Sequence, residues 1–317
     1  MFREIDLKFD DKRTTHLAKI SLDKSRVDLS SPIVFLCGGL VDVKQAKTPS
    51  IRDAFLRYVS SIECNLIDQI TLAEEFKDWI HDSVYKDLLD FENDIAHISS
   101  LIVIVLESPG ALAELGLFVR NKVLNKKLVV FVNDKHYSAN SFVSLGPLRY
   151  LEAIKDKTVC AYPWDLENID ESLGDSLPEM REDLLAAMSG MDNSEAFDSG
   201  NDGHVSFVLY EIIRIFRALK VSEIQTYSKY IGLDLKLDKV KRLLFLLTKF
   251  ELIATGKRGH DLYYYPLTDV DKIHFGGHFD KNEAKVATMQ FYAFNDSESR
   301  RFNFIKGLQK KEKEGAL

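Results

Sequence analysis

The sequence predicts an α/β protein whose larger part is a mostly parallel sheet with helices on both faces. Short apolar runs without alternation occur at 33–37, 101–106 and 128–132, and such runs are typical of strands buried on both faces of a parallel sheet. Between them, apolar residues recur at helical spacing, as over 51–62. After 204 the pattern changes to three helices and a hairpin, which predicts a second, smaller α+β domain.

The run 101–106 leads directly into a helix start. Ser108 can cap the free amides, Pro109 suits the first helical position, and Leu112 and Leu115 begin a helical repeat. Free N–H groups and the positive end of the helix dipole meet at such a junction. In α/β sheets this is where ligands bind, so we expect the site here.

The first turn of this helix is nearly bare, because it contains Gly110, Ala111 and Ala113. Glu114 is the one acid on this small, apolar surface. It is either a surface glutamate that interacts favourably with the helix start, or a catalytic carboxylate in a pocket.

Other strand ends are expected at the same edge of the sheet. The first strand ends in Gly38 and Gly39, which mark a tight turn or a close backbone approach to a ligand. Weaker signals predict a strand near 66–70, a long helix over 73–99 and a strand at 158–162. Asp94, near the end of that helix, is a candidate pocket acid.

Composition narrows the class of protein. A length of 317 residues suggests two domains, and no apolar stretch approaches the ~20 residues needed to cross a bilayer. The cysteines Cys37, Cys64 and Cys160 are few and widely spaced, which indicates neither a disulfide framework nor a metal site. We therefore expect a cytoplasmic protein with no membrane contact and no bound metal.

Charge is unevenly distributed along the chain. Residues 205–317 contain 20 Lys and Arg against 14 Asp and Glu, whereas the whole chain has a net charge of −7. An acidic first part and a basic second part fit a catalytic domain joined to a module with a different partner. The expected organisation is an N-terminal arm at 1–32, a catalytic domain at 33–188, a Gly/Ser/Asn/Asp-rich linker at 189–204 and an interaction domain at 205–317 with its tail.

Helices predicted over 207–219, 222–231 and 237–250, followed by a hairpin around 256–259, follow the winged-helix plan. Basic residues on the third helix and at the hairpin form a candidate contact with nucleic acid or a protein partner: Lys239, Arg242, Lys249, Lys257 and Arg258. Both kinds of partner remain open, because winged helices serve both.

Two sets of motifs carry a resemblance to known families. Glu-Asn-Asp at 92–94, the strand that follows, and Ser-Pro-Gly-Ala-Leu-Ala-Glu-Leu-Gly at 108–116 resemble the nucleoside 2-deoxyribosyltransferases. With Phe-Leu-Cys-Gly-Gly at 35–39, Glu-Ser-Pro-Gly at 107–110 and the segment 142–149, the chain is similar to the deoxyribosyltransferase-like effectors of bacterial retron anti-phage systems.

The resemblance implies a flavodoxin-like fold and cleavage of N-glycosidic bonds. Glu114 matches the family's nucleophile, and Asp94 matches the acid that binds the nucleoside or protonates the base. A carboxylate suits the first role because the transition state is oxocarbenium-like. The residues expected to bind the substrate are Cys37, Gly38, Gly39, Glu92, Asn93, Ser108, Pro109, Gly110, Ala111 and Gly146.

The chain departs from the family at Ser108, where an aspartate is usual six residues before the nucleophile. Loss of an acid matters least when the leaving group needs no proton, as when nicotinamide leaves NAD. The resemblance therefore implies a toxin that takes NAD or another nucleotide as substrate, needs no cofactor, and is restrained by a retron reverse transcriptase and its multicopy single-stranded DNA until phage infection. A homo-oligomer is also expected. The alternative is a non-enzymatic, nucleotide-sensing, DNA-binding regulator.

Overall fold

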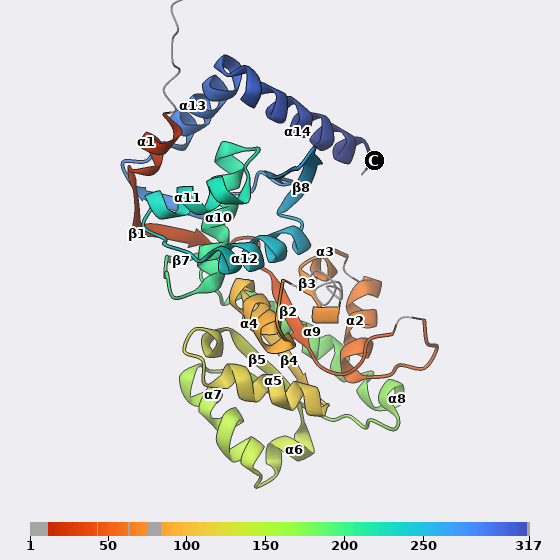
Figure 1. Ribbon diagram of the computed structural model, residues 1–317. Coiled ribbons are helices and arrows are strands. Elements are labelled where there is room, and N and C mark those ends of the chain that lie inside the picture. The colour runs from red at the N-terminus through yellow and green to blue at the C-terminus, as the bar shows by residue number, and fades with distance from the viewer. Residues whose placement is uncertain (1–11, 43, 63, 75–83, 316–317) are drawn as a thin grey trace, which may run out of the picture. The chain divides into compact units, whose positions relative to one another are not determined.

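The computed structural model describes residues 12–42, 44–62, 64–74 and 84–315 (Figure 1). The chain divides into two compact units. One unit, the α/β unit, comprises residues 29–193. The other, the terminal unit, combines residues 12–28 with 194–315, so segments from both ends of the described chain lie in the same unit. These boundaries differ from the expected ones, because the N-terminal segment belongs with the C-terminal part of the chain.

The α/β unit contains a five-stranded parallel sheet in the order β3-β2-β4-β5-β6. Its strands are β2 Val34–Cys37, β3 Ile70–Thr71, β4 Leu101–Leu106, β5 Leu128–Asn133 and β6 Val159–Tyr162. This is the flavodoxin-like order, and it confirms the predicted α/β class. The direction of strand succession reverses between β2 and β4, so this fold places a ligand crevice at their carboxyl ends.

Helices connect these strands (Figure 1). They are α2 Ile51–Ile62, α3 Cys64–Ile67, α4 Leu88–Ile98, α5 Pro109–Val119, α6 Asp134–Ser138, α7 Arg149–Ile154, α8 Ile169–Leu173 and α9 Ser176–Ser189, with the 3₁₀ turn η2 Leu124–Lys127 and the π-helical turn η3 Ser144–Leu148.

Side chains alternate between the two faces of the sheet. Val103 and Phe131 belong to a core with α2, α8 and α9, where Phe55 packs edge-on against Phe131 at 5.9 Å between ring centroids. Cys37 and Ile104 are paired in register and point to the other face. Cys37 lies near acids of α4 and α5, so these helices cover that second face.

Two elements of the α/β unit have bounds that differ from the expected ones. The helix expected over 73–99 is shorter: α4 begins after Asp87, whose side chain accepts a hydrogen bond from the Asp90 N–H at 2.9 Å. Residues 75–83 of that expectation lie outside the described residues. The strand expected near 66–70 is instead the short helix α3 followed by the two-residue strand β3.

The terminal unit begins with α1 Arg13–Leu17 and β1 Ile20–Asp28. Strand β1 lies between β10 Ile273–Gly277 and β7 Ser194–Ala196, and pairs antiparallel with both. Within the expected N-terminal arm, residues 20–28 therefore form a nine-residue central strand, and the expected linker contains a strand. Sequence reading missed this sheet because its strands come from distant parts of the chain and alternate only weakly.

The rest of the terminal unit follows the predicted order. It contains α10 Asp202–Phe216, α11 Val221–Tyr230, α12 Leu237–Lys249 and the antiparallel hairpin β8 Ile253–Arg258 with β9 Asp261–Pro266. Leu219, between α10 and α11, exchanges two backbone hydrogen bonds with Tyr264 of β9, of 3.0 and 2.7 Å. The connection between the first two helices thus adds a third, minimal strand to the hairpin.

The C-terminal segment forms two helices, α13 Lys281–Phe294 and α14 Asp296–Gly315. Tyr292 donates to the backbone carbonyls of Phe216 and Ala218 at 2.9 and 3.1 Å, and its ring stacks on Phe302 at 4.6 Å. The C-terminal segment is therefore docked on the end of α10. Throughout the described ranges, no helix has the length and apolar character needed to cross a membrane.

Candidate functional site

Glu107, directly after β4, joins the ends of the two strands at the reversal point. Its Oε1 accepts hydrogen bonds from the N–H groups of Gly39 at 2.8 Å and Arg52 at 3.0 Å, and its Oε2 accepts one from Ile51 at 2.6 Å. Burial raises the pKa of Glu107, while these backbone bonds oppose the rise. Since three donors engage it, Glu107 anchors the start of α2 rather than serving as a reactive group.

The glycines after β2 are explained by packing. A Cβ on Gly38 would lie 3.0 Å from Arg52 Cβ, and one on Gly39 would lie 2.6 Å from Ser50 Cβ. The expected direct approach of a ligand to this backbone is therefore not what requires glycine here. The loop after Gly39 is also fixed, because Ser50 Oγ donates to the Leu40 carbonyl at 2.7 Å and Arg57 donates to the loop backbone.

Arg52 supplies the positive charge of the site. Its guanidinium is buried and donates to the carbonyls of Leu36 at 3.1 Å and Gly39 at 2.7 Å. It also forms an ion pair with Glu74. Arg52 is therefore held by backbone carbonyls beneath the acids of the site.

Glu114 lies in the second turn of α5 and is half-buried. Burial raises the pKa of Glu114 to about 7, and the negative charge of Glu92 adds to the effect. The positive charge of Arg52 opposes it. Oε2 of Glu114 is buried and has no hydrogen-bond partner among the described residues. A carboxylate with a raised pKa and an unpaired oxygen is typical of a functional site.

Cys37, at the carboxyl end of β2, lies beneath these acids and is fully buried. Burial raises the pKa of the Cys37 thiol well above its usual range, and the charges of Glu114 and Glu92 raise it further. The thiol therefore stays protonated and contributes packing rather than nucleophilic chemistry. Cys37 is close enough to Glu114 for the charge of that carboxylate to act on the thiol.

Helix α4 presents Glu92 and Asp94 in different directions, since residues two apart on a helix point roughly 200° apart. Burial raises the pKa of Glu92, and the charge of Glu74 adds to it. Asp94 is buried and accepts a hydrogen bond from Tyr85 Oη at 3.0 Å. The intervening Asn93 contributes its carbonyl oxygen to a 2.8 Å contact with His97 Nδ1. The electrostatic neighbour of Glu114 on this helix is Glu92.

The first turn of α5 is only partly as expected. Ser108 caps the helix, because its Oγ accepts a hydrogen bond from the Ala111 N–H at 3.1 Å, and Pro109 occupies the first turn. Gly110 is exposed, and a Cβ there would meet only Ser108 Oγ, at 3.7 Å. Ala111 is completely buried, so its side chain packs in the core and does not face a substrate.

Two cavities lie along a different side of α5. One, of about 460 Å³, is lined by Ser108, Pro109 and Trp164 among others. The other, of about 550 Å³, contains Gly146 together with Gly116. Because Gly116 lies two residues after Glu114, it points roughly 200° away from it. Gly146 therefore lines a separate cavity and not the wall beside Glu114.

Sequence reasoning missed Arg52 and Glu74. Arg52 is the second residue of an otherwise amphipathic helix, where a basic residue is usually solvated, and only its hydrogen bonds to strand-end carbonyls reveal its position. Glu74 follows the short strand β3 and belongs to no motif. Across the described ranges, no group of three or more His, Cys, Asp or Glu side chains is arranged to hold a metal ion.

The five basic residues expected to form one contact surface in the terminal unit differ in exposure and in their partners. Lys239 is paired with Asp202 at 2.5 Å, Arg242 is half-buried, and Lys249 lies over the Phe245 ring at 5.3 Å. Leu246, on the same helix, is completely buried. The exposed members are two residues at the end of β8, Lys257 and Arg258.

The sheet has the strand order of α/β folds that bind their ligands at the reversal point, and acids gather there. Comparison with known families is more specific. The model of the STM3845 retron effector protein family matches residues 48–255, and the chain belongs to this family.

Two proteins of Escherichia coli are similar to the chain. The retron Ec73 putative ribosyltransferase/DNA-binding protein is 27% identical over 286 residues, which cover 82% of this chain and 88% of that protein. The retron Ec86 putative ribosyltransferase/DNA-binding protein is 32% identical over 126 residues, which cover 40% of this chain and 39% of that protein.

Proposed function

We propose that the α/β unit cleaves the N-glycosidic bond of a nucleotide, with Glu114 as the nucleophile. The observation that carries this proposal is the half-buried Glu114 carboxylate, whose pKa is about 7 and whose Oε2 has no hydrogen-bond partner among the described residues. The family and the word ribosyltransferase in the names of both relatives support glycosyl transfer as the reaction class.

The chemistry follows from the charge of the site. One Glu114 oxygen attacks the anomeric carbon while the carbon–nitrogen bond breaks and its electron pair leaves with the base. The transition state is oxocarbenium-like, so positive charge develops close to Glu114 and Glu92. A poorly solvated carboxylate interacts more strongly with that charge than a hydrated one. Water then hydrolyses the glycosyl ester and releases the sugar.

Glu92 is a better candidate than Asp94 for the acid that donates a proton to the leaving base. Burial and the charge of Glu74 raise the pKa of Glu92, which favours the protonated form that can donate a proton to a leaving base. Asp94, the acid that the family resemblance favours, is buried against Tyr85. We therefore assign the proton-donating role to Glu92 and a positioning role for α4 to Asp94.

NAD suits this site better than a neutral deoxynucleoside. Nicotinamide leaves without protonation, and its ring nitrogen starts cationic, so the attached sugar is drawn toward the acids. Ser108, at the place of the family's aspartate, uses its hydroxyl oxygen to cap α5. The acidic surroundings of Glu114 thus favour a substrate that brings a positive charge.

A trapping experiment tests the proposal. The purified chain, together with its retron partner complex, is incubated with 2-fluoro-arabinosyl analogues of NAD and of deoxyadenosine, which slow hydrolysis of a glycosyl ester. The proposal predicts a glycosyl adduct on the peptide that contains Glu114, found by mass spectrometry, and none after Glu114→Gln. An adduct on a different residue, or no adduct while the base is released, contradicts a Glu114 nucleophile.

A second function, DNA contact, is proposed for the terminal unit. It is supported by the hairpin with its exposed Lys257 and Arg258 and by the words DNA-binding in the names of both relatives. The natural ligand in a retron is the multicopy DNA held by the reverse transcriptase. In this proposal the terminal unit tethers the effector to that complex, which restrains the toxic reaction until phage infection.

A further inference from the structure

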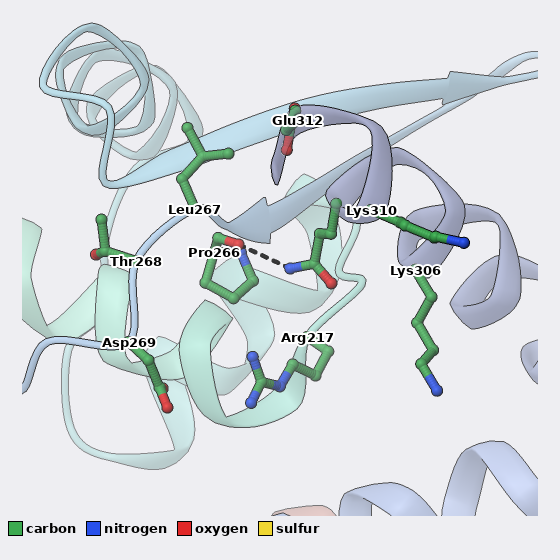
Figure 2. Close-up of a pocket in the computed structure, with 9 residues that line it drawn as sticks. Arg217, Pro266, Leu267, Thr268, Asp269, Lys306, Lys310 and Glu312 are labelled. Atoms are coloured by element: carbon green, nitrogen blue, oxygen red, sulfur yellow. Dashed lines mark hydrogen bonds between the residues drawn. The ribbon is translucent and has the colours of Figure 1, made fainter. Parts of the chain in front are cut away.

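A cavity of about 630 Å³ opens in the terminal unit between the end of α10, the segment after β9 and α14 (Figure 2). Three of its lining residues are cationic and two are acidic: Arg217, Lys306, Lys310, Asp269 and Glu312. Nothing in the proposed glycosidic chemistry uses this cavity. Its size lies within the range of ~300–1,000 Å³ that is usual for small-molecule sites.

The two acids already interact with other groups of the protein. Asp269 Oδ1 forms an ion pair with Arg214 Nη1 at 2.9 Å, and Glu312 Oε1 accepts a hydrogen bond from Tyr265 Oη at 2.7 Å. Each interaction engages only one oxygen of the carboxylate, so the other oxygen can accept a hydrogen bond from a ligand hydroxyl. The positive charge of Arg214 also balances the negative charge of Asp269.

Arg217 is held in a rare backbone conformation. It follows the last residue of α10 with φ 69° and ψ −109°, a backbone conformation that residues other than glycine seldom adopt. Its guanidinium forms no hydrogen bond or ion pair with any residue that the structure describes. In the view of Figure 2, Arg217 lies between Asp269 and Lys306, and its guanidinium is turned toward Asp269. A strained residue whose cationic group has no internal partner is typical of a ligand clamp.

The wall opposite is fixed and partly apolar. Gln309 Nε2 of α14 donates to the Pro266 carbonyl at 2.8 Å, which joins the helix to the segment after β9. Pro266 is buried, and Leu267 next to it is 37% exposed. Leu267 therefore offers an apolar side chain against which a base can pack.

We propose that this cavity binds a ribonucleotide, with its phosphates on Arg217 and Lys306 and its ribose hydroxyls on Asp269 or Glu312. Acidic side chains recognise ribose hydroxyls elsewhere, and guanidinium groups pair with phosphates. A continuous nucleic-acid strand fits less well, because its successive phosphates would meet the two carboxylates. The site is a regulatory one, since all of its residues belong to the terminal unit, which contains no residue of the Glu114 site.

The test uses the full-length chain with Glu114→Gln, so that no base is released during titration. Calorimetry measures binding of ATP, 2′,3′-dideoxy-ATP, inorganic triphosphate and a twelve-nucleotide single-stranded DNA. We expect one ATP-binding event that Arg217→Gly and Lys306→Gln each weaken about tenfold, because each loses a charge-assisted hydrogen bond. Dideoxy-ATP should bind about tenfold more weakly than ATP, and triphosphate alone more weakly still.

Lys241→Gln provides the matched control, because Lys241 is an exposed lysine on α12 outside the cavity. Arg217→Gly should fold normally, since glycine adopts positive φ without strain. Equal ATP affinity in Arg217→Gly and its parent, or no ATP binding by the parent, would overturn the proposal. So would triphosphate binding as tight as ATP, which would show a phosphate site only, and so would DNA binding that is tighter than ATP binding and lost with Arg217, which would show a strand groove.

Discussion

The Gly39 N–H donates to Oε1 of Glu107 over 2.8 Å, and this hydrogen bond joins the carboxyl ends of β2 and β4. Glu107 is the acid nearest to the strand end in sequence, yet its oxygens are occupied by backbone donors of Gly39, Ile51 and Arg52. Glu114, in the second turn of α5, keeps an oxygen without a partner among the described residues. The structure thus separates an anchoring acid from a reactive one.

Glu107→Gln should destabilise the α/β unit while leaving the Glu114 carboxylate in place. A glutamine amide turns a donor toward backbone N–H groups that need an acceptor, so we expect the free energy of unfolding to fall by about 2–3 kcal/mol. Chemical denaturation followed by circular dichroism measures the change. Glu167→Gln, at an exposed loop position, is the matched control. Equal stability of the two variants would contradict the anchoring role of Glu107.

Gly39 and Gly110 should respond differently to the same substitution. A Cβ on Gly39 meets Ser50 Cβ at 2.6 Å, so Gly39→Ala should cost about 1–3 kcal/mol through overpacking. Gly110 lies at an open helix surface, so Gly110→Ala should be neutral or stabilising by up to about 1 kcal/mol. Thermal unfolding compares them. Gly110→Leu should also fold but lower turnover, and normal turnover in Gly110→Leu would place the substrate elsewhere.

Much of the fold was predictable from the sequence because it depends on local patterns. The apolar runs at β2, β4 and β5 and the cap at Ser108 were predicted at nearly their observed positions. Strand β1 was not, because its partners β7 and β10 lie far along the chain and only tertiary pairing stabilises it.

The site was predictable only in part for a similar reason. A motif identified Glu114, but the choice between Glu92 and Asp94 depends on which side of α4 faces α5. Arg52 acquires its role from carbonyl groups at the end of β2, and no sequence pattern marks it. Electrostatic neighbours from separate elements appear only in three dimensions.

Stability should depend on pH through Glu114. Its folded pKa of about 7 exceeds the ordinary 4.5, so the unfolded state loses its proton first and the folded state loses stability as pH rises from 4.5 to 7. Glu114→Gln removes this loss. After allowance for partial solvent exposure, the variant should gain roughly 2 kcal/mol over wild type at pH 8 and little at pH 4. Denaturant titrations at both pH values measure the gain, and an equal gain at both would contradict the raised pKa.

Glu92→Gln and Asp94→Asn should have separable effects. Removing the Glu92 charge lowers the pKa of Glu114, so the inflection of kcat/KM near pH 7 should move to lower pH. For a base that needs protonation, such as adenine, turnover should also fall by about 10²-fold or more. Asp94→Asn should leave the inflection in place and lower the melting temperature through its bond to Tyr85. The reverse pattern would restore Asp94 as the functional acid.

DNA contact through the hairpin should show in its salt dependence. The double substitution Lys257→Gln with Arg258→Gln removes two exposed cationic side chains. The slope of log K against log salt concentration for single-stranded DNA should therefore become shallower by about 1.4. Lys239→Gln is the control, because Lys239 is already paired with Asp202. Fluorescence anisotropy of the full-length chain gives both slopes. An unchanged slope in the double variant would remove the hairpin from the interface.

Release of free base is the most direct measure of the central claim that Glu114 cleaves a glycosidic bond. The chain and its retron partner complex are incubated with NAD and, separately, with deoxynucleosides, and nicotinamide or base is followed by chromatography. The account predicts release from NAD by wild type and a loss of about 10³-fold or more in Glu114→Gln, since the nucleophile is gone while the fold remains. Turnover of Glu114→Gln within a few-fold of wild type would contradict it.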